Sequence, residues 1–362
     1  MSRSARSAAI AAAAWALIGL HATAHAEPYL AVQQGLTCGQ CHFNPTGGGM
    51  RNGVGNAFAQ NVLPARHVDT GGFVWTGALN TFIATGGDLR GNATWTSPSN
   101  ADSAFNLEEV RLYLGVTMIP DRLFFYLDEK VAPDAAVNRE AWAMYRFGDE
   151  RWYLRAGRMN LPYGLRLQDQ QAFVRQVTGI NMDTPDDGME IGYLSGPWNA
   201  QLALSNGTAG GAENNNGKQY TALVSYVRDS WRAGVSGNHN DASGLRSTSG
   251  GVFGGLRTGP VAWLAEGDLV NVQIGALPQQ HLAAAILEAN WRAIPGGNLK
   301  FSAEWLDPDR DHNGPIDTRF SLVAEYTPIQ YLQLRLGART LDNQGPQSQT
   351  INQAFLELHA YF

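Results

Sequence analysis

The stretch Leu332-Gln333-Leu334-Arg335-Leu336-Gly337-Ala338-Arg339 decides the fold, because apolar residues alternate along it with polar or small ones. Successive side chains of a β-strand point to opposite faces. The pattern therefore predicts a strand with one apolar and one polar face. The same alternation occurs at 299–305 and 319–326. Alternating segments of about ten residues are typical of transmembrane β-barrels.

A soluble β-sandwich would show the same alternation, so the lengths of the connections must discriminate between the two classes. Longer polar segments, such as 207–217 and 307–315, separate consecutive short turns. Outer-membrane barrels alternate short periplasmic turns with long extracellular loops in this way. The short turns are expected at 120–121, 148–149, 196–197, 229–230, 259–260, 295–297 and 328–329.

Counting the strands between these turns and loops predicts an all-β chain with sixteen antiparallel strands, running from about Phe73 to about Phe362. The number is even, so both ends of the barrel lie on the periplasmic side. The last strand presents Ala354, Leu356, Leu358, Ala360 and Phe362 on one face. A terminal aromatic after an alternating strand resembles the C-terminal signal of outer-membrane barrels. We therefore expect the chain in the bacterial outer membrane, in contact with its lipid.

The composition agrees with a membrane barrel and disfavours a nucleic-acid partner. Charged residues make up 16% of the chain, against about 25% in soluble proteins. Glycine is abundant at 41 residues, and aromatic residues make up 10%. These residues provide bends and interfacial girdles. The formal net charge is −6, and no basic patch is interleaved with aromatic residues, so nucleic-acid binding is not expected.

The N-terminus has the layout of a secretory signal peptide. Arg3 and Arg6 precede the apolar run Ala8–Leu20, and Ala24-His25-Ala26 forms a cleavage site of the A-x-A type. The apolar run is too short to span a bilayer. We therefore predict a signal peptide at 1–26, a short segment at 27–71 and the barrel at 72–362.

The two cysteines of the chain, Cys38 and Cys41, lie in the sequence Cys38-Gly39-Gln40-Cys41-His42. A disulfide is the default for two cysteines in an exported protein, but Cys-x-x-Cys-His is the attachment pattern of c-type haem. Two thiols add to the vinyl groups on one edge of the porphyrin, and the next histidine then lies under the ring as a ligand of the iron. The pattern predicts one covalent haem c, with His42 as proximal ligand. A redox motif is disfavoured because no thioredoxin-like βαβ pattern surrounds it.

The sixth ligand of the haem iron stays open between several alternatives. Met50 follows His42 by eight residues, which span at most ~26–29 Å, so the chain would be taut. His67 has ample slack. A ligand from the barrel wall and an open coordination site are the remaining alternatives.

The segment 27–71 is too short to fold alone without a cofactor, metal or partner. We expect the haem to serve as its core and the segment to plug the lumen or its periplasmic mouth. The apolar pieces 29–32 and 54–58 would cover the ring. The run Gly47-Gly48-Gly49 would let the backbone lie close against it.

A sixteen-stranded barrel is wide enough to enclose an aqueous lumen. The connection 160–187 is a candidate for an inward-folded constriction, and residues 155–164 resemble a stretch common in trimeric porins. The alternation assigns a set of charged residues to the lumen: Arg111, Arg155, Glu288, Arg292, Lys300, Glu304, Arg319, Glu325, Arg335, Arg339 and Glu357.

The loop at 309–317 is a candidate cation site. Asp309, Asp311 and Asn313 follow the D-x-D-x-N-G start of a calcium loop, and Asp317 occupies the ninth position. Phe320 stands where such a loop needs a glutamate. A plain polar loop is the alternative, and Ca²⁺ or incoming Fe²⁺ would suit these oxygen ligands.

The combination of signal peptide, one haem motif at Cys38-Cys41-His42 and a barrel resembles the fused cytochrome c–porins, which include the outer-membrane iron-oxidising cytochromes. The resemblance implies single-electron transfer between an extracellular donor, with Fe²⁺ as leading case, and periplasmic c-type cytochromes, with Fe(II) oxidase activity. The stretch 43–49 departs from the pattern of the iron oxidisers and leaves the donor open. Outward electron transfer, or a passive porin with a structural or sensory haem, are the alternatives.

Overall fold

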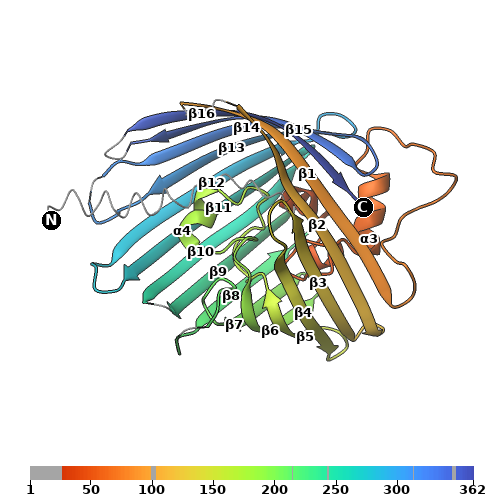
Figure 1. Ribbon diagram of the computed structural model, residues 1–362, viewed down its shortest axis with the longest axis horizontal. Helices are drawn as coiled ribbons and strands as arrows, with labels where there is room; N and C mark the ends of the chain where they lie inside the picture. The colour runs from red at the N-terminus through yellow and green to blue at the C-terminus, as the bar shows by residue number, and fades with distance from the viewer. Residues whose placement is uncertain (1–26, 99–102, 214, 243, 313, 345–347) are drawn as a thin grey trace.

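The computed structural model describes residues 27–362, apart from 99–102, 214, 243, 313 and 345–347. The predicted signal peptide therefore lies outside the described residues. The described strands form one closed antiparallel barrel of sixteen strands, in which each strand pairs with its neighbours in sequence and β1 closes on β16 (Figure 1). The predicted fold class is confirmed.

The strands are β1 (Ile83–Ser97), β2 (Ser103–Ile119), β3 (Leu123–Ala132), β4 (Val137–Phe147), β5 (Trp152–Met159), β6 (Asp186–Ser195), β7 (Trp198–Ser205), β8 (Gln219–Val227), β9 (Trp231–Ala242), β10 (Leu245–Thr258), β11 (Val261–Ile274), β12 (Gln280–Trp291), β13 (Gly297–Asp307), β14 (Asp317–Ile329), β15 (Leu332–Asn343) and β16 (Gln349–Tyr361).

The first strand begins at Ile83 and not near Phe73 as predicted. The residues before it pair with a helix of the N-terminal segment, α3 (Gly53–Asn61). Gln60 accepts a hydrogen bond from the Trp75 amide at 3.1 Å. Asn56 donates to the Thr76 carbonyl at 2.9 Å. These backbone groups are thus satisfied outside the sheet, so the barrel starts later than the alternation suggested.

Short turns gather on one rim of the barrel, as predicted, and both ends of the sheet lie there. The Phe362 amide donates to the Gly87 carbonyl at 3.0 Å, and Figure 1 places the C-terminus beside α3 at this rim. One turn is shifted, because β14 runs through Ile329 and the turn is formed by residues 330–331. The prediction that short and long connections alternate strictly is wrong, because on the opposite rim β9 ends at Ala242 and β10 already begins at Leu245.

The outer surface of the barrel is apolar. Leu334 and Leu336 of β15 and Leu356 and Leu358 of β16 are exposed, as the alternation predicted, and so are apolar residues of the other strands. An apolar band around a closed barrel faces lipid, so the predicted location in the bacterial outer membrane is confirmed. Among the described residues, the helices are too short or too polar to cross a membrane.

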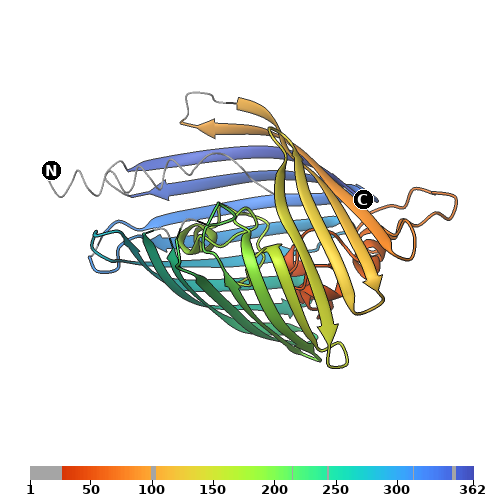
Figure 2. The same cartoon turned by 60° about the horizontal axis from the view of Figure 1, so that its bottom comes forward.

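The lumen has polar walls, and chain segments fold into it. All eleven predicted lumen charges take part in ion pairs or hydrogen bonds, such as Arg335–Glu357 at 2.9 Å. All of them are buried or half-buried. Residues 160–185 fold inward from β5 to β6 and carry α4 (Phe173–Thr178) (Figures 1 and 2). The predicted inward segment is confirmed.

The inner segment 160–185 is held by carboxylates of the far wall. The Leu165 amide donates to Glu266 at 2.8 Å. The Phe173 amide donates to Glu304 at 2.8 Å. Buried acceptors of this kind are costly to leave unpaired, so these contacts fix the segment across the lumen.

The N-terminal segment closes the rim of short turns. Its first helix, α2 (Pro28–Gln34), ends at Gly35, which packs against Asp229 in the turn between β8 and β9. After α3, the Ala65 amide donates to the Thr327 carbonyl at 2.8 Å, close to the turn that follows β14. The segment is therefore anchored at both sides of the periplasmic mouth.

Gly192 in the lumen wall provides a test of the packing around Tyr153. An added Cβ at Gly192 would lie 2.1 Å from the ring of Tyr153, which is buried and bonded to Glu190 at 2.6 Å. We expect Gly192→Ala to lower the free energy of unfolding by about 1–3 kcal/mol through overpacking. The measurement is urea unfolding in lipid vesicles, followed by tryptophan fluorescence. Gly250→Ala is the control, because its Cβ would make only an ordinary contact, at 4.0 Å from the Ser236 carbonyl oxygen. Equal stability of the two variants would contradict this packing.

Candidate haem-binding site

The motif Cys38–His42 is placed by a short helical turn. A 3₁₀ helix, η1 (Cys38–Gln40), is capped by Thr37, whose amide donates to the Gln40 side chain at 2.7 Å. The His42 amide donates to the Cys38 carbonyl at 3.1 Å. Thus the two cysteines and the histidine are held on one turn of the backbone. The next residues form a hairpin, in which His42 pairs with Arg51.

The three glycines of this hairpin are required by its geometry. Gly47, Gly48 and Gly49 all have positive φ, at 90°, 80° and 62°, a region that favours glycine. A Cβ on Gly48 would lie 2.8 Å from Met182 of the inner segment, and one on Gly49 would lie 2.3 Å from the Tyr126 hydroxyl. The hairpin backbone therefore runs tightly between the barrel wall and the inner segment. Its three glycines also line the cavity described next.

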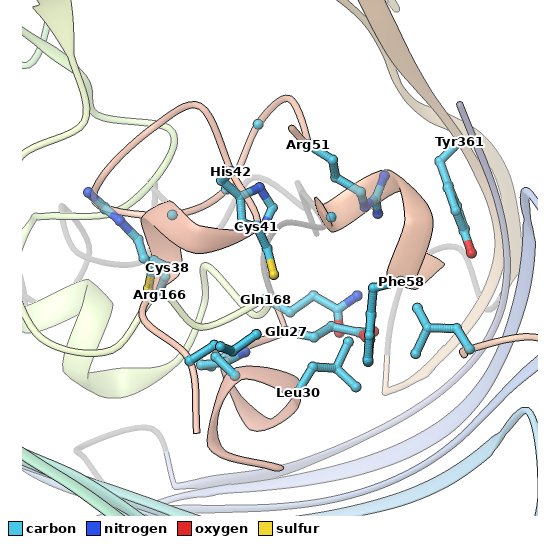
Figure 3. Close-up of a pocket in the computed structure, with 18 of the residues that line it drawn as sticks. Glu27, Leu30, Cys38, Cys41, His42, Arg51, Phe58, Arg166, Gln168 and Tyr361 are labelled. Carbon is cyan, nitrogen blue, oxygen red and sulfur yellow. The ribbon is translucent and has the colours of Figure 1, made fainter. Parts of the chain in front are cut away.

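Cys38, Cys41 and His42 line one cavity of about 1090 Å³, a volume that includes its opening to solvent. Its lining joins these three side chains to apolar residues of the N-terminal segment, as a site for a largely apolar cofactor requires. Figure 3 shows Cys41 and His42 on one side of this space and Leu30 opposite them, with Phe58 and Tyr361 toward one end. Leu30 and Phe58 belong to the two apolar pieces that we expected to cover the ring.

The charge state of His42 suits a ligand of iron. Burial lowers the pKa of His42 to about 4, and Arg51 acts in the same direction. The ring is therefore neutral at neutral pH, as metal ligation requires. Its Nδ1 is buried without a hydrogen-bond partner among the described residues.

The two cysteines are free and line the cavity together with His42. Burial, followed by the neighbouring Cys38 thiol, raises the pKa of Cys41. The residues present therefore fit covalent attachment of a haem.

The hairpin is locked to the barrel through Asn44, which is completely buried. Its amide nitrogen lies 2.8 and 2.7 Å from the two Glu140 oxygens, and its amide oxygen accepts from Arg155 at 2.8 Å. Arg155 in turn donates to Glu190 at 2.8 Å. The cavity is thus held in place by a buried polar network that reaches three strands.

The two predicted candidates for the sixth ligand lie away from the cavity lining. Met50 is buried in a cluster with Tyr113, Tyr126 and Trp142 of the barrel wall. His67 is exposed. It lies at the periplasmic rim, because the amide of the next residue, Val68, donates to the Gln330 side chain at 2.9 Å. The structure therefore does not bring either side chain together with His42 in the cavity.

Sequence reasoning missed His359, Asp88 and Tyr361, which line the cavity from the barrel wall. His359 bonds to Asp88 and to Gln333. The alternation of the last strand places His359 and Tyr361 on its lumen face, which could have been foreseen. Their meeting with the haem motif depends on the closure of β1 on β16, which pairs Asp88 with Tyr361. His359 is thus a histidine that the barrel wall contributes to the cavity, and both of its ring nitrogens are hydrogen-bonded, to Asp88 and Gln333.

The predicted cation loop lies on the opposite rim, and its carboxylates have other partners. Asp309 bonds to His312 at 2.9 Å and Asp311 to His281 at 2.7 Å. Asp317 accepts from the Gln344 amide at 3.2 Å. Asn313 lies outside the described residues. In the part of the chain that the structure describes, no three His, Cys, Asp or Glu side chains are grouped as a metal site.

The comparisons with solved structures show the fold of outer-membrane porins. OmpT of Vibrio cholerae aligns with a TM-score of 0.63 at 12% identity, covering 77% of this chain and 97% of that one. The anion-selective porin from Comamonas acidovorans aligns with a TM-score of 0.62 at 13% identity, covering 77% and 99%. The channel DcaP of Acinetobacter baumannii has a TM-score of 0.59 at 12% identity, covering 77% and 97%. Neither a family model nor a curated relative matches the sequence.

Two glycines at the start of α3 provide a matched test of the site. A Cβ on Gly55 would lie 2.1 Å from the Cys41 carbonyl, whereas one on Gly53 would have open space. We expect Gly55→Ala to push α3 off the motif, at a cost of about 1–3 kcal/mol. Trypsin should then cleave the segment 27–71 several-fold faster in the detergent-solubilised protein. Gly53→Ala should be cleaved at the parent rate. Equal rates in all three proteins would rule out this contact.

Proposed function

We propose that this chain is an outer-membrane electron-transfer protein that carries one haem c at the periplasmic mouth of its barrel. The observation that carries the proposal is the convergence of Cys38, Cys41 and His42 on one cavity that apolar residues of the N-terminal segment also line. The cavity lies at the rim of short turns, since α2 and the end of α3 that border it are anchored there.

The chain's own residues would hold the group as follows. Cys38 and Cys41 would form thioether bonds to the two vinyl groups, and neutral His42 would ligate the iron. Leu30 and Phe58, which line the cavity, would cover the ring and exclude water, which would tune its potential. When bound, the haem supplies a one-electron iron couple.

The position of the cavity suits exchange of electrons with periplasmic c-type cytochromes. Fe²⁺ is the leading donor from outside, and each Fe²⁺ oxidised to Fe³⁺ gives up one electron, which amounts to Fe(II) oxidase activity. Electron flow in the outward direction, toward an extracellular acceptor, uses the same residues. The measured potential and the physiological partner decide between the two directions.

A second candidate function is the passive passage of small solutes, with a haem that is structural or sensory. The similarity of the fold to solved porins supports this alternative. Against it stands the folding of residues 160–185 and of the N-terminal segment into the barrel (Figures 1 and 2).

Mixing with Fe²⁺ tests the electron-transfer proposal. We expect Fe²⁺ to reduce the haem of the purified protein in stopped-flow spectroscopy, because the mouth of the cavity is open to solvent. Cys38→Ser combined with Cys41→Ser should give a colourless barrel, since both anchors are lost. No reduction by Fe²⁺ at any pH tested would remove iron oxidation. Failure of dithionite to reduce the haem would remove electron transfer altogether.

Conductance separates the two candidate functions. Because chain segments occupy the lumen from both rims, we expect the protein in planar lipid bilayers to pass far less current than an open sixteen-stranded porin, which encloses an aqueous channel. A purified porin of known conductance, inserted in the same bilayers, is the control. A steady conductance equal to that of the control porin would favour the passive-porin function.

A further inference from the structure

A second cavity borders the haem motif on the other side of Cys38. Its volume is about 530 Å³, including its opening to solvent. It lies beneath the start of α2 and the inner segment, against the wall of β7 to β10. The lining combines apolar residues such as Leu223 and Phe253 with polar ones such as Asn199 and Ser225. Two arginines, Arg166 and Arg232, also line it.

Arg166 comes from the inner segment and is 6% exposed. Its guanidinium donates to the Thr46 carbonyl at 3.3 Å and to the Leu161 carbonyl at 2.7 Å. Glu140 attracts it from a distance, but the oxygens of that carboxylate are bonded to Asn44 and to the Asn160 amide. Burial lowers the pKa of Arg166 to about 10. Its charge thus has no direct carboxylate partner among the residues described.

Arg232 comes from β9 and is 8% exposed. It donates to the Leu36 carbonyl at 2.6 Å and lies beside the Cys38 thiol. Its Nε is buried with no hydrogen-bond partner in the described part of the chain. The other buried arginines of the lumen, such as Arg155 and Arg175, have carboxylates in direct contact.

We propose that Arg166 and Arg232 bind the carboxylate of a small organic acid in this second cavity. Buried cations without a partner cost free energy, which a bound anion recovers. Arginine presents a planar fork of donors that matches a carboxylate. The charged side of the cavity would take the acid group, and Leu223 and Phe253 would contact an apolar body, which favours an organic acid over an inorganic anion.

The carboxylate could come from a free acid or from a propionate of the predicted haem. Both arginines lie near Cys38, whose thioether would join the vinyl edge of the porphyrin. Arg166 lines both cavities, whereas Arg232 is among the lining residues of the second cavity and not of the first, which favours a free acid in the second cavity. Access from the periplasm is short, because Asn199 and Arg232 directly follow the turns at 196–197 and 228–230.

The test is isothermal titration calorimetry of the full, detergent-solubilised protein with sodium benzoate and, separately, with sodium phosphate. We expect saturable binding of benzoate at one site. Arg232→Gln should weaken it at least tenfold, and so should Arg166→Gln, which serves if the first variant does not fold. Arg246→Gln is the matched control, because this exposed arginine pairs with Asp241 on the far rim. Heat-dependent electrophoretic mobility confirms that each barrel is folded.

The haem-free protein with Cys38→Ser and Cys41→Ser identifies the source of the carboxylate. Benzoate binding by the haem-containing protein supports a free acid as ligand. If only the haem-free protein binds benzoate, the arginines are assigned to a haem propionate. No benzoate binding by either protein, binding of phosphate alone, or an affinity for benzoate in Arg232→Gln and Arg166→Gln equal to that of the parent protein would overturn the proposal. Because the haem-free barrel can be titrated, these outcomes are independent of whether the chain transfers electrons.

Discussion

The buried contact between Asn44 and Glu140 is the interaction on which the rest of the site depends. An ionised carboxylate inside a barrel wall must be compensated by donors, and Glu140 receives them from the haem-motif hairpin and from the Asn160 amide. One side chain of the wall therefore fixes both the N-terminal segment and the start of the inner segment. Arg155 extends the same network to Glu190. The position of Cys38, Cys41 and His42 follows from this lock.

Chain segments thus enter the lumen from both rims and meet near its periplasmic end. The arrangement differs from an open barrel in that a cavity lined by Cys38, Cys41 and His42 lies next to the mouth. A redox group held there would be close to periplasmic partners and screened from them only by α2 and α3. The same crowding leaves Arg166 and Arg232 buried beside the motif without direct carboxylate partners among the described residues.

Local patterns in the sequence predicted the wall of this molecule well and its interior poorly. Alternation along β15 and β16 predicted which side chains meet lipid, because strand geometry alone decides it. The start of β1 was wrong because Trp75 and Thr76 bond to α3, a contact that no local pattern reveals. His359 and Asp88 escaped notice for a related reason, since only barrel closure brings the two ends of the sheet to one cavity. Covalent haem itself rests on the Cys-x-x-Cys-His pattern and stays a prediction.

The central claim is that a haem is bound by thioethers at a pore mouth built by the same chain. Intact-mass spectrometry tests it most directly, on protein purified from the outer membrane of a host that matures c-type cytochromes. The account predicts the mass of the chain beginning at Glu27 plus one haem, retained after denaturation. The mass of the same chain without haem, lowered by two hydrogens for a disulfide between Cys38 and Cys41, would contradict it.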